Sequence, residues 1–191
     1  MATRPLSRLL LFATAGALFG RAISIIPSPE VHDVFWVANL SSPWLLLPFL
    51  AGFGQRSYRW GAITGVAADV SCVLGFYAGF LSLDPLRYGL QASAPLLQVA
   101  FASLGNWLVF IAPWVGAAVT AGLLYGLLGC WWGRTRSILP AAMVATPFIL
   151  EPIAWRLREG FFPRPAMLWV VEAMLGVLTL LEMARVSRRP S

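Results

Sequence analysis

Long runs of apolar residues dominate this chain and decide what it can fold into. A helix needs about 20 consecutive apolar residues to cross the hydrocarbon core of a bilayer. Six segments approach that length, at roughly 7–26, 34–54, 60–82, 110–132, 137–155 and 165–185. Inside lipid only helices and closed barrels satisfy their own backbone polar groups, and runs of this length are typical of helices. We therefore predict an all-α bundle of six transmembrane helices in one integral-membrane domain, residues 1–191.

The composition excludes most soluble classes of protein. Of 191 residues, 59% are hydrophobic and only 12% are charged, whereas a soluble domain carries roughly a quarter charged residues. The net charge of +6 would suggest nucleic acid in a soluble domain, but no basic face can form across membrane-length spans, so no nucleic-acid partner is expected. Cys72 and Cys130 stand singly in apolar runs, which indicates buried, inert thiols.

The basic residues predict an orientation. All 14 are arginines, and with the N-terminus in the cytoplasm most of those outside the spans fall on the inner side, as the positive-inside rule requires. The inner set is Arg4, Arg8, Arg56, Arg59, Arg134, Arg136, Arg185, Arg188 and Arg189, and the outer set is Arg87, Arg156, Arg158 and Arg164. We therefore expect both termini in the cytoplasm.

Residues 96–132 form one uncharged stretch that is too long for a single perpendicular span. Pro113 should kink or break a helix there. We expect 110–132 to span, and 96–110 to lie on the outer interface, re-enter the membrane or span it. A seventh span would nearly erase the charge bias, so six spans are favoured.

Glycines recur at four-residue spacing along the predicted helices. Four pairs have this spacing: Gly16 and Gly20, Gly61 and Gly65, Gly75 and Gly79, Gly122 and Gly126. Such notches let helix backbones approach closely, which drives association in lipid. The pattern predicts a tight bundle within one chain or a homodimer face.

Four charged residues lie too deep in the predicted spans to be assigned to a loop: Arg21, Asp69, Glu151 and Glu172. A charge at mid-bilayer costs about 3 kcal/mol on insertion scales, so each needs a partner or water. Asp69 is predicted near mid-membrane and the other three in the outer half. At 100° per residue, Asp69 shares a face with Gly61, Gly65 and Cys72, so we expect it to face protein.

Prolines lie beside polar residues in two of the six predicted spans. Pro43 should kink or unwind the helix at Asn39–Ser42, and Pro147 and Pro152 flank Glu151. Irregular backbone at membrane depth is tolerated where it is buried in protein or lines a cavity. Discontinuous helices around a polar site are how many transporters bind substrate.

These features together predict an outward-facing polar pocket that binds or transports a small polar or cationic solute or ion. The candidate ligand-binding residues are Arg21, Asn39, Ser41, Ser42, Asp69, Glu151 and Glu172. We expect Arg21 to pair with Glu151 or Glu172, and Asp69 to lie at the pocket floor as a ligand contact or proton acceptor. Three carboxylates against one arginine favour a cation, a metal ion or a proton over an anion.

The four intramembrane charges also fit a purely structural role. A buried ion pair can simply fix helix register, and long side chains can extend to the membrane surface. The functional alternative is a non-transporting subunit, scaffold or sensor that works through helix–helix interaction. It predicts a filled interior with every intramembrane charge paired.

Catalytic patterns are weak. The single histidine, His32, lies beside Glu30 and Asp33 in a predicted outer loop, which is more typical of a solvated turn than of a metal site. Glu151 and Arg156 have part of the spacing of an intramembrane CAAX-type protease motif, but Pro152 replaces the second glutamate and no later histidine follows. We expect no metal or cofactor, and an enzymatic role is disfavoured.

Several short motifs resemble those of one family. They are Asn39 followed by Ser-Pro-Trp44, Ala68-Asp69 followed by Tyr77, Glu151, and Trp169-x-x-Glu172-x-x-x-Gly176. Together they resemble an uncharacterised family of small multi-pass membrane proteins of high-GC bacteria. The resemblance covers most of the chain and implies a bacterial plasma-membrane location, with no assigned activity.

Overall fold

The computed structural model describes residues 5–26, 41–78, 95–160 and 166–187. These residues are almost entirely helical and contain no strand, which confirms the all-α class. The helices are α1 (Pro5–Ser24), α3 (Ser41–Gly52), α4 (Tyr58–Ala78), α6 (Leu96–Thr135), α7 (Ile138–Glu159) and α8 (Ala166–Ser187). Five of them are long and apolar enough to cross a membrane, and α3 is a shorter apolar helix of 12 residues. The chain is therefore a multi-pass membrane protein.

A sharp turn joins α6 to α7 because two residues interrupt the helical backbone. Arg136 adopts a left-handed conformation with φ of 52°, and its N–H closes α6 on the Trp132 carbonyl at 2.9 Å. Ser137 then caps α7, where its hydroxyl accepts a hydrogen bond from the Leu139 N–H at 3.4 Å. Gly160 ends α7 in the left-handed conformation.

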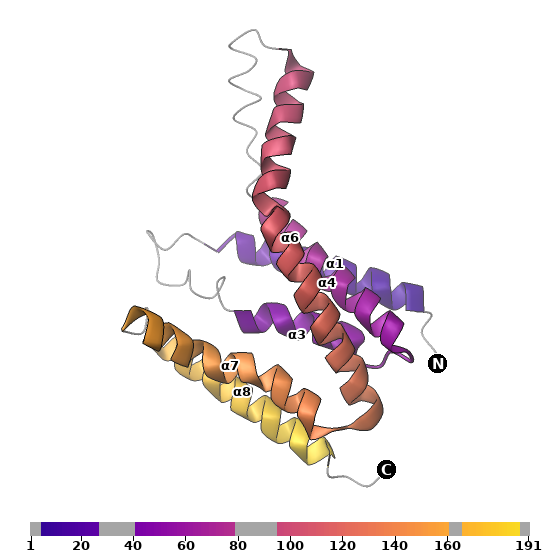
Figure 1. The fold of residues 1–191 in the computed structure, drawn as a ribbon, viewed down its shortest axis with the longest axis vertical. Helices are drawn as coiled ribbons and strands as arrows, with labels where there is room; N and C mark the ends of the chain where they lie inside the picture. The colour runs from indigo at the N-terminus through magenta and orange to yellow at the C-terminus, as the bar shows by residue number, and fades with distance from the viewer. Residues whose placement is uncertain (1–4, 27–40, 79–94, 161–165, 188–191) are drawn as a thin grey trace.

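The helices form one group of four and one pair (Figure 1). In the group of four, α4 packs against α1 and α6, and α3 packs against α4 and α6. The α7–α8 pair packs mainly on itself and makes smaller contacts with α3 and α6. A buried cluster that includes Phe49, Tyr125, Val144 and Met183 joins the pair to the group.

Glycine notches hold the group of four together, as the sequence predicts. A Cβ added at Gly16 or Gly20 would overlap the backbone of α4 at the Ala68 and Cys72 carbonyls. A Cβ at Gly122 would lie 2.7 Å from the Val66 Cα, and one at Gly65 would lie 2.7 Å from the Gly126 Cα. These separations are shorter than any real Cβ contact, so only glycine fits. The notches therefore serve packing within one chain.

Helix α6 differs from the sequence-based prediction. Residues 96–110 are not a separate piece, because one helix of 40 residues runs from Leu96 to Thr135 and includes Pro113. Its length is about 60 Å at 1.5 Å per residue, roughly twice a hydrocarbon core. Its first half extends beyond the other labelled helices, and the helix changes direction near its middle (Figure 1). Pro113 is exposed, so its ring bends the helix without disturbing a packed core.

Candidate functional site

Asp69 lies in the middle of α4 and inside the group of four. Its side chain is only 3% exposed, and the neighbouring Ala68 and Cys72 are completely buried. Gly61 and Gly65 on the same face are buried too, which confirms that Asp69 faces protein. Among the described residues the Asp69 carboxyl has no hydrogen bond and no ion pair. It is therefore a buried carboxyl without a counter-charge in this part of the chain.

Glu151 and Glu172 lie together on the other part of the molecule. Gly176 on α8 meets Phe148 on α7, and the rings of Trp155 and Trp169 lie 6.1 Å apart. This antiparallel register places Glu172 opposite Pro152, the neighbour of Glu151. Glu172 is 3% exposed and Glu151 is half-buried. Both glutamates have interactions within the structure, so they differ from Asp69 in environment as well as in position.

Arg21 does not form the ion pair expected of it. It is exposed near the end of α1, where its Nη1 donates to the Ser24 hydroxyl at 3.2 Å. The Ser24 hydroxyl in turn donates to the Arg21 carbonyl at 2.8 Å. Helix α1 packs against α4 and α3, whereas the α7–α8 pair packs against α3 and α6. Arg21 is therefore held by its own helix and not by Glu151 or Glu172.

The prolines near the expected site do not break the helices that contain them. Helix α7 is continuous from Ile138 to Glu159 through Pro147 and Pro152. Ser41 and Ser42 are the first residues of α3, so the backbone is helical there, and Pro43 falls in the first turn, where it costs no hydrogen bond. Asn39 and the Ser41 and Ser42 side chains lie outside the described residues, as does His32.

A polar network that the sequence analysis missed joins α3, α4 and α6. Thr64 is completely buried, and its hydroxyl lies 2.7 Å from the Trp60 carbonyl and 3.1 Å from the Ala51 carbonyl. The Gln55 amide donates to the Thr64 hydroxyl at 3.4 Å, and the Cys130 thiol donates to the Gln55 carbonyl at 3.5 Å. Gln55 stands in a turn next to an arginine, so its sequence indicates a solvated loop and gives no sign of burial.

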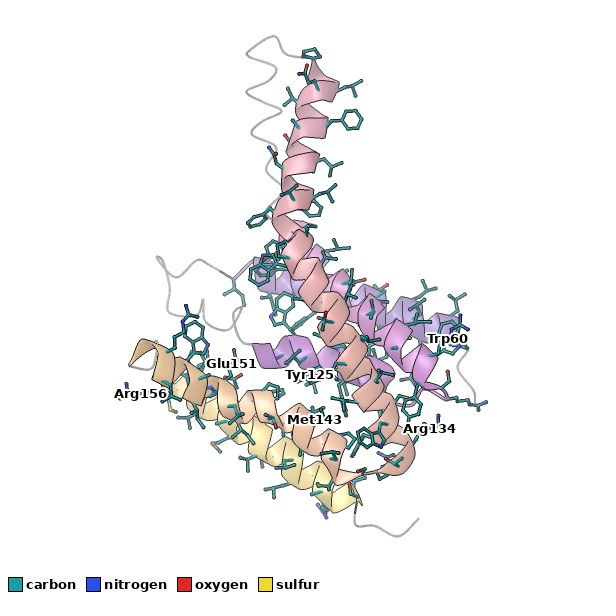
Figure 2. All side chains as sticks on the ribbon, viewed as in Figure 1. Trp60, Tyr125, Arg134, Met143, Glu151 and Arg156 are labelled. Atoms are coloured by element: carbon teal, nitrogen blue, oxygen red, sulfur yellow. The ribbon has the colours of Figure 1, made fainter. Side chains whose placement is uncertain are left out.

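Arginines gather around the turn between α3 and α4. Arg8 donates to the Phe53 carbonyl, and Arg134 Nη1 donates to the Arg56 carbonyl at 3.3 Å. The Arg134 guanidinium also lies 5.0 Å above the Tyr58 ring. Figure 2 shows Trp60 and Arg134 at the same end of the bundle, and Glu151 and Arg156 toward the opposite end of α7. We call the end with Arg8, Arg59 and Arg134 the arginine-rich end.

Two surface hollows are both apolar. One, of about 500 Å³, lies on the α7–α8 pair against Trp169, Val170 and Met174. The other, of about 630 Å³, lies between α1, α4 and α6. Neither is lined by Arg21, Asp69, Glu151 or Glu172. Within the described ranges, no three histidine, cysteine or acidic side chains are grouped so that they could hold a metal ion.

The comparisons with known proteins found no matching family model, no matching curated protein and no matching solved structure. The family resemblance noted from the sequence motifs therefore stays a prediction.

Proposed function

We propose that this chain is an inner-membrane protein, with its arginine-rich end in the cytoplasm, that binds a proton or a small cation at Asp69. The single observation that supports the proposal is the burial of this carboxyl without any partner among the described residues. Of the described arginines at helix ends, Arg8, Arg56, Arg59, Arg134, Arg136 and Arg185 lie at the arginine-rich end, and Arg21, Arg156 and Arg158 lie away from it. That bias supports the orientation.

Energetics favour a neutralising ligand. An isolated carboxylate inside a membrane protein costs about 3 kcal/mol or more, and no described side chain offers a counter-charge. The carboxyl must therefore carry a proton or hold a cation. Either species leaves the buried site electrically neutral.

Packing limits the size of the ligand. One turn from Asp69, Gly65 contacts α6 so closely that a Cβ there would lie 2.7 Å from the Gly126 Cα. On the α1 side, Gly16 lies directly against Ala68, the preceding residue. Backbones at this separation leave no room for a metabolite. This narrows the predicted ligand from a small polar solute to a proton or a bare cation.

Carbodiimide labelling tests the proposal. Dicyclohexylcarbodiimide enters lipid and reacts with protonated carboxyls, and intact mass and peptide mapping locate the adduct. We expect labelling of Asp69 in the wild type and loss of that adduct in Asp69→Asn. Glu172→Gln is the matched control. It removes a different buried carboxyl, which lies in the α7–α8 pair, and should leave the Asp69 adduct unchanged. A panel of monovalent and divalent cations then identifies any ion that protects Asp69.

An unlabelled Asp69 in folded protein without cations means that the carboxyl is deprotonated or out of reach of the reagent. If that protein also lacks the infrared C=O band of a neutral carboxyl, the proposal is contradicted.

The first half of α6 favours a second candidate, a membrane subunit that associates with another protein. Val109 is 77% exposed and Phe101 is 71% exposed. A Cβ at Gly105 or Gly116 would meet nothing within 4 Å. Because α6 is roughly twice the length of a hydrocarbon core, its apolar surface needs a cover of lipid or protein.

Photo-crosslinking tests this second candidate. A photoreactive residue at Val109 should give a discrete protein adduct in cells, while one at Leu181, which is 59% exposed on α8, should give only lipid adducts. An adduct at twice the chain mass would identify a homodimer. Lipid adducts alone at both positions would contradict a protein partner on this helix.

A further inference from the structure

An apolar groove runs along the surface of α4, and Asp69 is not one of its lining residues. Its walls include Leu9 from α1, Ala62, Val66 and Val70 from α4, and Val119 and Leu123 from α6. Its volume is about 630 Å³. The two flanking helices run in known directions relative to α4. Gly16 and Gly20 of α1 meet Cys72, with Gly16 also meeting Ala68 and Gly20 also meeting Phe76, so α1 is parallel to α4.

Each of the three walls has an arginine at the same end of the groove. Arg59 lies three residues before Ala62 and seven before Val66, on the groove face of α4. Arg8 directly precedes Leu9. Arg134 follows Leu123 by about three helical turns on the same side of α6, which runs antiparallel to α4 because Tyr77 packs on Trp114 while Gly61 meets Gly126.

Two of the three guanidinium groups, those of Arg8 and Arg134, contact the turn that precedes α4, and Arg59 lies in the first turn of that helix. Arg134 lies 5.0 Å above the ring of Tyr58, the neighbour of Arg59. Arg8 reaches the Phe53 carbonyl in the preceding turn, and its buried Nε has no hydrogen-bond partner. Within the described residues none of the three arginines forms an ion pair, since Arg8 and Arg134 contact uncharged groups such as carbonyls and rings. Carbonyl groups orient a guanidinium but leave its positive charge unneutralised.

We propose that an anionic phospholipid from the leaflet at the arginine-rich end occupies this groove. An acyl chain would lie on Val66, Val70 and Val119, and the phosphate would lie at Arg59 and Arg134, with Arg8 beside it. Guanidinium groups bind phosphate oxygens through pairs of N–H donors, and basic clusters between transmembrane helices select acidic headgroups. The groove contributes the apolar contacts that free phosphate cannot make.

Native mass spectrometry tests the proposal with two probes of identical acyl chains, phosphatidylglycerol and phosphatidylcholine. We expect the wild type to retain one phosphatidylglycerol about 25-fold more strongly than phosphatidylcholine, since each of the two arginines at the phosphate, Arg59 and Arg134, contributes about fivefold. Arg59→Gln combined with Arg134→Gln should abolish that preference. Arg185→Gln, which removes an exposed arginine that pairs with Glu182 at 3.4 Å on α8, is the matched control and should preserve it.

A second variant separates the groove from the charges. Ala67→Trp places a large ring in the groove and should lower retention of both phospholipids while leaving all arginines in place. Inorganic phosphate should not displace the bound lipid, because it lacks an acyl chain. Equal retention of the two phospholipids by the wild type would overturn the proposal. So would an unchanged preference in a folded Arg59→Gln, Arg134→Gln protein, or the appearance of dimers in place of bound lipid.

Discussion

The group α1, α3, α4 and α6 and the pair α7–α8 are held together by different means. In the group, glycines on all four helices bring backbones into direct contact, as where Gly20 meets Cys72 and Gly129 meets Phe49. Helix α7 contains no glycine, and the single glycine of α8, Gly176, lies closest to side-chain atoms of Phe148 and Ile149, with the Ala145 carbonyl oxygen farther away at 3.3 Å. Backbone contacts cannot yield to a larger residue, whereas the outer atoms of a side chain can rotate away from one.

The buried carboxyls follow the same division. Asp69 lies in the rigid group, and its carboxyl has no hydrogen-bond or ion-pair partner among the described residues, while Glu172 lies in the more adjustable pair and has interactions within the structure. An unpaired charge is least tolerable where the surroundings cannot move to accommodate it. We therefore expect the proton or cation to bind at Asp69 and not at Glu172.

The largest effect should come from closing a backbone notch. Gly20→Leu would force α1 away from the Cys72 carbonyl of α4, so we expect a loss of about 3 kcal/mol in the free energy of unfolding, or failure to fold. Gly116→Leu, at an open position of α6, should change stability little. Denaturation in matched detergent, followed by intrinsic fluorescence, measures both. Equal losses would contradict the backbone-contact account.

A smaller effect is expected from the same substitution in the pair. Gly176→Leu would approach the Phe148 Cβ at 2.6 Å and the Ile149 Cγ1 at 2.9 Å. The Ile149 Cγ1 can rotate aside, whereas the Phe148 Cβ moves only with its backbone. The approach is less close than at Gly20, so we expect a smaller loss of about 1–2 kcal/mol. The same denaturation experiment ranks this variant against Gly20→Leu, and a loss as large as that of Gly20→Leu would remove the distinction between the two regions.

The smallest predicted effect concerns the polar network at the turn between α3 and α4. Thr64→Val keeps the shape of the side chain but removes the hydroxyl that accepts from Gln55. We expect a loss of about 1 kcal/mol, because the buried Gln55 amide loses one acceptor and keeps its 3.4 Å contact with the Ala51 carbonyl. Gln55→Leu in the Thr64→Val background should recover part of that loss. No recovery would show that the two side chains are not coupled.

Sequence patterns predicted some features of the fold and of the candidate site but not others. Four-residue glycine spacing identified the faces that pack, and helical phase placed Asp69 on one of them, because both depend only on periodicity along a single helix. The continuation of α6 through Pro113 was not predictable in this way, since a proline is tolerated when it lies on an exposed surface. The prediction that Arg21 pairs with Glu151 or Glu172 was wrong for a different reason. Sequence indicates how deep a residue lies but not which helices become neighbours.

Infrared difference spectroscopy of Asp69 tests the central claim most directly. A neutral carboxyl in an apolar site has a C=O stretching band that is separate from the bands of carboxylates and of the peptide backbone. We predict such a band in the folded protein without added cations, its disappearance in Asp69→Asn, and its retention in Glu172→Gln. A cation that binds at Asp69 should also abolish the band in the wild type. An identical carboxyl spectrum in the wild type and in folded Asp69→Asn, with and without cations, would contradict the claim.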